Sequence, residues 1–238
     1  IGPVEVKLTE TVHTDVVAVA SGLSRSVFGA NPLIERGISY NRLLSCESDK
    51  LDIITAAIVC GSRVKVYKAV GGSTDEEAAE NARRAVALGF KALKTGVAGG
   101  RPARVIETPG FVDRAVGRIA AIREAVGKEI DIAIDFHGSV PPATSALLIK
   151  ALEPLQPMFI EEPVQCQNVD VLADLARKTH IPIATGERIF TKWGFREILE
   201  KRAAAVLQPD LSHAGGIFET RLIAGMAEAY YAVVAPHC

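Results

Sequence analysis

The sequence places an acidic residue or a histidine directly after a short apolar segment, and it does so at a nearly constant interval. Five residues stand in this position: Asp135, Glu161, Glu187, Asp210 and His237. The intervals between them are 26, 26, 23 and 27 residues. One strand, a loop, a helix and a returning loop occupy about that length. The spacing therefore predicts consecutive βα units, with each of the five residues at the end of a strand.

The same rhythm extends over most of the chain and predicts a (β/α) barrel. It begins at Val64–Val70, the first predicted strand, and the seventh strand ends at His237. In this fold the carboxyl ends of the strands open on one face, where the active site lies. A closed barrel needs an eighth strand. Because the chain begins at Ile1 rather than Met and stops one residue after His237, we expect a fragment. We predict an α/β fold, an incomplete TIM-type barrel of about seven strands.

Composition and charge argue against some classes of binding partner. The formal net charge is −1, from 27 Lys and Arg against 28 Asp and Glu, so nothing indicates nucleic acid or an anionic membrane surface. No apolar run reaches the roughly 18–20 residues that a membrane span needs. The four cysteines show no metal or disulfide spacing, which favours reduced thiols in a cytoplasmic protein. We therefore expect a small-molecule partner, no nucleic acid and no membrane.

Three of the strand-end acids indicate a metal site. Asp135, Glu161 and Glu187 end successive strands, so their carboxylates can converge on one point. Without a cation, three clustered carboxylates repel each other and some must take up protons. An all-oxygen site suits a hard divalent ion such as Mg²⁺. Any one of these acids alone would more commonly be a solvated loop end or a helix cap. Their shared period favours the three as ligands of Mg²⁺.

The ordered motifs resemble the mandelate racemase/muconate lactonizing branch of the enolase superfamily, and most closely its sugar-acid dehydratases of the D-galactonate type. The resemblance is carried by DFHG (135–138), MFIEEPV (158–164), PIATGERIF (182–190), LQPDLSHAGGI (207–217) and APHC (235–238). It extends from about Val64 to the C-terminus. It implies Mg²⁺, a reaction that begins by removing a proton α to a carboxylate, and a homo-oligomer when the chain is full length. It also implies that residues 1–61 are a truncated remnant of an α+β capping domain, and that residues 62–238 form the barrel without its last strand.

The resemblance also assigns catalytic roles. His237 would be the base, with Asp210 holding its other ring nitrogen and raising its basicity. His137 would protonate the departing 3-hydroxyl group, because elimination of a poor leaving group requires a general acid. Since it lies two residues past Asp135, we expect it to point to the same side of an extended strand. A histidine at a chain end is usually a plain surface residue, which is the alternative for His237.

Three further residues are candidates for substrate binding. Lys94 would bind the substrate carboxylate, although it could be a solvated lysine at a strand end. Racemases of the family carry a second base two positions after this lysine, where the present sequence has Gly96. His213 could line the site from the loop after strand six. Arg188 could reach substrate hydroxyls or pair with a neighbouring acid.

These observations predict a Mg²⁺-dependent lyase that dehydrates an aldonic acid, such as galactonate or gluconate, to a 2-keto-3-deoxy acid. Two alternatives stay open. One is racemase, epimerase or cycloisomerase chemistry on the same enolate. The other is a truncated barrel that binds metal without catalysis.

Overall fold

A computed structural model describes residues 66–97, 106–108 and 110–237 of the 238-residue chain. The capping-domain prediction for residues 1–61 lies outside these ranges, as do the first two residues of the predicted strand Val64–Val70.

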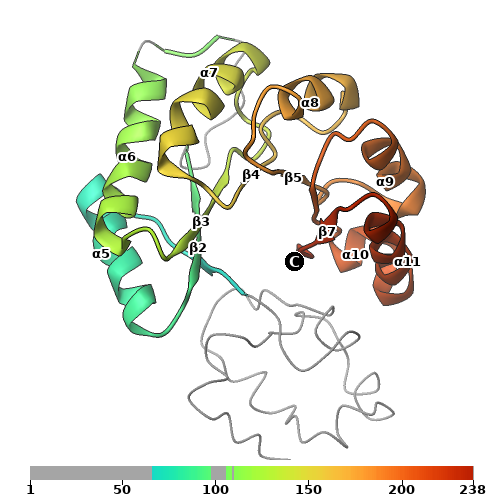
Figure 1. Ribbon diagram of the computed structural model, residues 1–238, viewed down its shortest axis with the longest axis horizontal. Coiled ribbons are helices and arrows are strands. Elements are labelled where there is room, and N and C mark those ends of the chain that lie inside the picture. The colour runs from blue at the N-terminus through green and yellow to red at the C-terminus, as the bar shows by residue number, and fades with distance from the viewer. Residues whose placement is uncertain (1–65, 98–105, 109, 238) are drawn as a thin grey trace, which may run out of the picture.

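The described residues form one sheet of seven parallel strands, in which spatial order follows sequence order. The strands are β1 (Lys68–Ala69), β2 (Ala92–Gly96), β3 (Asp131–Asp135), β4 (Phe159–Glu161), β5 (Ile183–Thr185), β6 (Val206–Leu207) and β7 (Val233–Val234). Figure 1 shows the sheet as a curved arc. Within the described residues β1 pairs with β2 and β7 pairs with β6, so these two strands form the edges. The predicted incomplete TIM-type barrel is confirmed.

Helices alternate with the strands and lie outside the arc (Figure 1). They are α5 (Asp75–Ala87), α6 (Phe111–Val126), α7 (Pro142–Leu152), α8 (Val169–Ala176), α9 (Thr191–Glu200), α10 (Leu211–Ala214) and α11 (Gly216–Ala229), with the short 3₁₀ helix η2 (Glu153–Leu155) after α7. The alternation agrees with the predicted βα units. The sequence did not predict α10, a single turn that begins after Asp210 and ends at Gly215, where φ is +110°.

The start of α5 shows how the sequence fixes a helix end. Thr74 is the N-cap, and its hydroxyl accepts a hydrogen bond from the backbone N–H of Glu77 at 3.2 Å. The carboxylate of Glu77 in turn accepts from the backbone N–H of Ser73 at 2.7 Å. The sequence predicts a reciprocal pair between Thr74 and Glu77. The structure keeps the cap but moves the second bond one residue earlier.

Alternation along the strands separates the core from the site. Ile132 and Ile134 belong to the large cluster that packs the sheet against the helices, while Ala133 belongs to a small cluster with Phe159 and other inward residues. Successive side chains of a strand point to opposite faces. Asp135, two residues after Ala133, therefore points into the barrel interior, at the carboxyl end of the strands.

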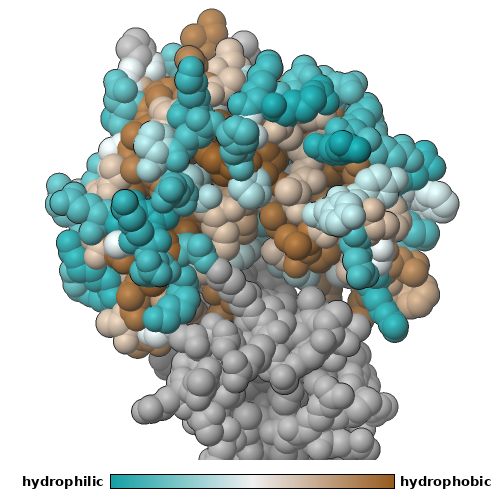
Figure 2. All heavy atoms as spheres, viewed as in Figure 1, coloured by the Kyte–Doolittle hydropathy of each residue, from teal (hydrophilic) through white to brown (hydrophobic). Residues whose placement is uncertain are grey.

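One face of the molecule has a largely polar rim. Figure 2 shows hydrophilic residues over most of the outer rim of the helices in this view, with hydrophobic residues between them and toward the middle. None of the described helices combines the length and the apolar character required to cross a membrane.

Gly186 allows β5 and β6 to lie close together just below the site. Its φ is +149°, and a Cβ at this position would lie 2.6 Å from the backbone nitrogen of Gln208. Real Cβ atoms do not approach backbone that closely, so any side chain here would separate the two strands. The residue before Glu187 must therefore be glycine.

Replacing Gly186 with Ala should lower the free energy of unfolding by at least about 2 kcal/mol, because it adds backbone strain to the overlap with Gln208. Chemical denaturation followed by circular dichroism measures this change. Gly225→Ala in α11 is the matched control, since a Cβ there meets no atom within 4 Å. It should leave stability unchanged or raise it by up to about 1 kcal/mol. Equal stabilities of the two variants would contradict the prediction.

Candidate active site

Lys94 joins two of the predicted metal ligands. Asp135 is the last residue of β3 and Glu161 the last of β4, and the two are direct partners in the strand register. The ammonium Nζ of Lys94, from β2, lies 2.7 Å from Oε1 of Glu161 and 3.2 Å from Oδ2 of Asp135. A single cationic group thus contacts both carboxylates. The neighbouring strand ends of β2, β3 and β4 form one half of the site.

Burial and neighbouring charges shift the pKa values of Glu161 and Lys94 in this half of the site. Burial raises the pKa of Glu161, which is fully buried, while Lys94 opposes the rise and Asp135 adds to it. Burial alone would lower the pKa of Lys94, but the charges of Glu161 and Asp135 raise it overall. Lys94 therefore stays protonated and supplies positive charge to a pair of acids that would otherwise repel each other.

Glu187 lies at the centre of the other half. It follows β5, and its carboxylate lies between two imidazoles: Nε2 of His237 is 3.3 Å from Oε2, and Nδ1 of His137 is 3.8 Å from Oε1. Despite this closeness, Oε2 is buried and forms no well-aligned hydrogen bond with any described residue. Nδ1 of His137 is also 3.7 Å from Oδ2 of Asp135, which connects the two halves. The site is a continuous cluster of carboxylates with cationic or titratable groups between them.

Asp210 contacts His237 across the strand ends of β6 and β7. Its Oδ2 lies 3.0 Å from Nδ1 of His237, and the two residues also form an isolated parallel bridge. Its Oδ1 accepts hydrogen bonds from the backbone N–H groups of Ser212 and His213 at 2.8 and 3.0 Å. Burial raises the pKa of Asp210, but these bonds outweigh burial and hold it below its usual value. An ionised carboxylate therefore orients one ring nitrogen of His237 and leaves the other facing Glu187.

His137 reaches the cluster by a different route from the one predicted. The strand ends at Asp135, and His137 has a φ of +53°, so the chain is turning rather than extended. The turn is held by the backbone N–H of His137, which donates to Oδ1 of Asp135 at 2.7 Å. The premise of an extended strand was wrong, because the carboxylate of Asp135 captures the backbone two residues on. The side chain still faces Asp135 and Glu187, and it is 64% exposed.

Arg188 pairs with Glu162, the residue that directly follows β4. Nε of Arg188 lies 3.0 Å from Oε1 of Glu162, and Nη2 contacts Oε2. Of the two alternatives for Arg188, the structure shows pairing with a neighbouring acid. Hydrogen bonds to Glu162 raise the pKa of Arg188. Burial raises the pKa of Glu162 to about 7 against the opposing effect of Arg188. The charge of this buried carboxylate therefore depends on the guanidinium.

His213 lies beside the site rather than among the acids. It is on α10, and its Nδ1 is 2.9 Å from the backbone carbonyl oxygen of Glu187. Its ring also lies 6.0 Å from that of Phe190. The residue can therefore fix the loop after β5 that carries Glu187. Among the described residues, none of its recorded contacts is with Asp135, Glu161 or His237.

Sequence reasoning missed the contribution of Gln208. Gln208 directly follows β6 and is almost fully buried, and it acts to lower the pKa of Glu161 by hydrogen bonding. Both of its amide atoms nevertheless lack a partner of good geometry in the described part of the chain. The signal was available in the motif Gln208-Pro209-Asp210, since a glutamine two residues before Asp210 points to the same side of a strand.

The donor types of the three predicted ligands fit a hard divalent cation. Among the described residues, however, the group whose ligand atoms all lie within 4.8 Å of one another is His137, Glu162 and Glu187, not the predicted trio. Asp135, Glu161 and Glu187 offer oxygen donors only, which Mg²⁺ prefers. Oε2 of Glu161 and Oε2 of Glu187 are both buried without a hydrogen-bond partner among the described residues, an arrangement that costs free energy unless a cation compensates it. The ammonium of Lys94 between Asp135 and Glu161 shows that this position accepts positive charge.

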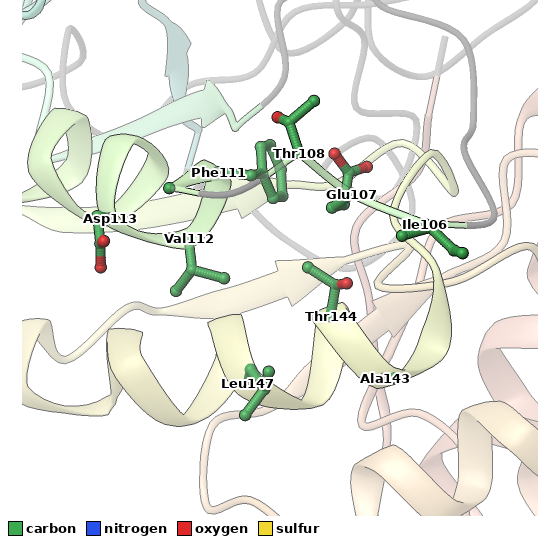
Figure 3. A pocket seen from close by; sticks show the side chains of 10 residues that line it. Ile106, Glu107, Thr108, Phe111, Val112, Asp113, Ala143, Thr144 and Leu147 are labelled. Atoms are coloured by element: carbon green, nitrogen blue, oxygen red, sulfur yellow. The ribbon is translucent and has the colours of Figure 1, made fainter.

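A separate pocket lies away from these acids. It is a cavity of about 340 Å³ between the start of α6 and the start of α7, and Figure 3 shows residues from both helices and from the preceding loop around it. Its lining includes Ile106, Thr108, Phe111, Thr144 and Leu147. None of the candidate site residues contributes to it. It therefore plays no part in the acid cluster.

Comparison with known proteins places this site in a family. Residues 77–238 match the family described as enolase C-terminal domain-like. A solved structure from Roseovarius sp. TM1035, described as a mandelate racemase/muconate lactonizing enzyme-like protein, is 41% identical with a TM-score of 0.66; the match covers 69% of this chain and 42% of that one. A mandelate racemase/muconate lactonizing enzyme from Jannaschia sp. CCS1 is 38% identical with a TM-score of 0.67, covering 72% and 47%.

A third structure, a candidate dehydratase from Mesorhizobium loti, is 32% identical with a TM-score of 0.69, covering 72% of this chain and 47% of that one. The chain thus spans about half the length of the solved structures that it matches. The match includes every strand end that carries a site residue after β1. The chain belongs to the enolase C-terminal domain-like family, in the mandelate racemase/muconate lactonizing branch of the enolase superfamily.

Proposed function

We propose that this chain carries the catalytic residues of a Mg²⁺-dependent lyase that removes water from an aldonic acid, such as galactonate or gluconate, and yields a 2-keto-3-deoxy acid. The observation that carries the proposal is the arrangement of two histidines around Glu187. One of them, His237, has a buried aspartate partner, while His137 is largely exposed. A paired base and an accessible acid are what elimination requires.

Asp135, Glu161 and Glu187 are the residues that would hold Mg²⁺. When bound, the ion supplies positive charge that stabilises the negative charge developing on the substrate carboxylate as the C2 proton leaves. Lys94, already shared by two of these acids, binds the same carboxylate through its ammonium group. The substrate is thereby oriented with C2 toward the imidazoles.

The proton movements are then assigned to the two histidines. His237, oriented by Asp210 through Nδ1, accepts the C2 proton at Nε2. His137 donates a proton to the 3-hydroxyl group, and the C3–O bond breaks to release water. The enol that results takes up a proton at C3 to become the 2-keto-3-deoxy acid.

A second candidate is proton transfer without water loss, as in a racemase or epimerase. That chemistry needs a base on the opposite face of C2. Two positions after Lys94, where family racemases carry a lysine, this chain has Gly96, which has no side chain. The absence of a titratable group at that position favours dehydration.

Several broader properties follow as proposals from the same assignment. The whole protein would be a homo-oligomer that acts in the cytoplasm on a small-molecule sugar acid. The division into a capping segment at residues 1–61 and a barrel at residues 62–238 is part of this proposal.

Substituting His137 with Asn should reduce 2-keto acid formation about 100-fold or more, because the leaving group then departs without a proton donor. Exchange of the C2 hydrogen with deuterated solvent should continue, since His237 and Asp210 are intact. A screen of aldonic acids with Mg²⁺, followed by colorimetric detection of 2-keto acids and by NMR, measures both. The control is His180→Asn, an exposed histidine outside the cluster, which should change neither rate. Loss of both activities in His137→Asn would refute the separation of acid from base.

Replacing Glu187 with Gln should abolish the stabilisation of the chain by Mg²⁺. A cation that binds only the folded chain adds about 2.7 kcal/mol at 100 times its dissociation constant. Thermal unfolding with Mg²⁺ and with EDTA measures the shift. Glu228→Gln, on the exposed surface of α11, is the control and should keep the full shift. A shift of equal size in both variants would rule out Glu187 as a ligand.

A further inference from the structure

A second set of potential metal-ligand atoms overlaps the proposed Mg²⁺ site. One ligand atom each from His137, Glu162 and Glu187 lies within 4.8 Å of the others. Glu162 and Glu187 are buried, and Oε2 of Glu187 has no hydrogen-bond partner among the described residues. The two sets share Glu187, so a cation bound in one would compete for the ligand of the other.

The two sets differ in donor chemistry. Asp135, Glu161 and Glu187 provide oxygen atoms alone, which favour Mg²⁺. The second set combines one imidazole nitrogen with two carboxylates, a combination that binds Zn²⁺ and related transition metals. Capture of Zn²⁺ there would remove both His137 and Glu187 from the proposed reaction.

In the structure the guanidinium group of Arg188 binds the carboxylate of Glu162. Its Nε and Nη2 contact one carboxylate oxygen each, a two-point arrangement that engages both oxygens. Glu162 is fully buried and has a φ of +40°, and its backbone carbonyl accepts a hydrogen bond from the N–H of Gly138 at 2.9 Å. The carboxylate is therefore held in one place, facing the guanidinium.

The surrounding loops leave room for the guanidinium. A Cβ on Gly138, whose φ is +60°, would overlap Nη2 of Arg188. The backbone carbonyl of Arg188 accepts a weak hydrogen bond from Sγ of Cys166 at 3.9 Å. The loops after β3, β4 and β5 thus meet at the Arg188–Glu162 ion pair, directly beside Glu187, which Arg188 approaches to 3.7 Å.

We propose that Arg188 determines metal selectivity: by occupying both oxygens of Glu162, it prevents His137, Glu162 and Glu187 from binding a transition-metal ion and leaves Glu187 to the all-oxygen site. The inference rests on the proposed Mg²⁺ site. Arg188 is a positioning residue, because it acts on the cation through Glu162.

The test is Zn²⁺ binding to the full 238-residue chain, measured by isothermal titration calorimetry, with Co²⁺ absorption as a second readout of coordination. Arg188→Met should bind Zn²⁺ about 10- to 100-fold more tightly than the parent, since Glu162 becomes available. Arg196→Met is the matched control, because this arginine lies on α9 and pairs only with exposed Glu200 among its recorded ion pairs. It should leave the affinity unchanged.

Two double variants identify the atoms responsible. Adding Glu162→Gln to Arg188→Met should return Zn²⁺ affinity to the parent value, and so should adding His137→Asn. If Arg188 merely stabilised the loops, Arg188→Met would gain no affinity and neither second substitution would have a gain to remove. That result would overturn the inference.

Two further measurements make every outcome decisive. Arg188→Lys keeps a cation beside Glu162 but cannot engage both oxygens, so it should show a smaller gain in Zn²⁺ affinity. If Arg188→Met does not fold, Arg188→Lys is the deciding variant. An unchanged Zn²⁺ affinity in Arg188→Lys would then refute the inference. Mg²⁺ titration of the parent chain tests the proposed function separately. Absence of Mg²⁺ binding there would reject the metal site, whereas Mg²⁺ binding without a Zn²⁺ gain in the Arg188 variants would reject only the selectivity role.

Discussion

The parallel register of the strands is the constraint on which the site depends. The strands β3 and β4 are aligned so that Asp135 is the partner of Glu161. The backbone register alone therefore brings the two carboxylates together at one edge of the sheet. Alternation then turns both into the barrel interior. Such a cluster is unfavourable unless positive charge lies within it, and Lys94 from β2 provides that charge in the structure. The fold therefore concentrates negative charge, and the chemistry follows from what neutralises it.

Much of this architecture could be predicted from the sequence, because the same physical requirement repeats in every unit. A buried parallel strand needs an apolar run, and the functional residue must come where that run ends. This is why the positions of Asp135, Glu161 and Glu187 at strand ends could be read directly. The turn at His137 could not be predicted in this way. It depends on a hydrogen bond from the backbone N–H of His137 to the carboxylate of Asp135, and the spacing of apolar residues does not indicate such a bond.

The remaining differences have the same origin in local contacts. The pairing of Glu162 with Arg188 joins residues 26 positions apart whose meeting requires a glycine at position 138. Both residues were visible in the sequence, yet their partnership depends on three loops that pattern analysis treats separately. The single turn of α10 was likewise not predicted. Its N-cap is Asp210, which the sequence analysis had assigned only to holding His237.

Asp210 illustrates how one carboxylate can constrain an imidazole through a helix. One oxygen caps α10 through two backbone N–H groups, so the side chain has no freedom to rotate, and the other oxygen meets Nδ1 of His237. The carboxylate can only accept there, so the neutral ring that would act as a base carries its hydrogen on Nδ1 and its lone pair on Nε2. An asparagine could preserve the cap while presenting an amide hydrogen to the ring, which would select the opposite tautomer. The distinction between a proton acceptor and an inert ring thus depends on one atom in a helix cap.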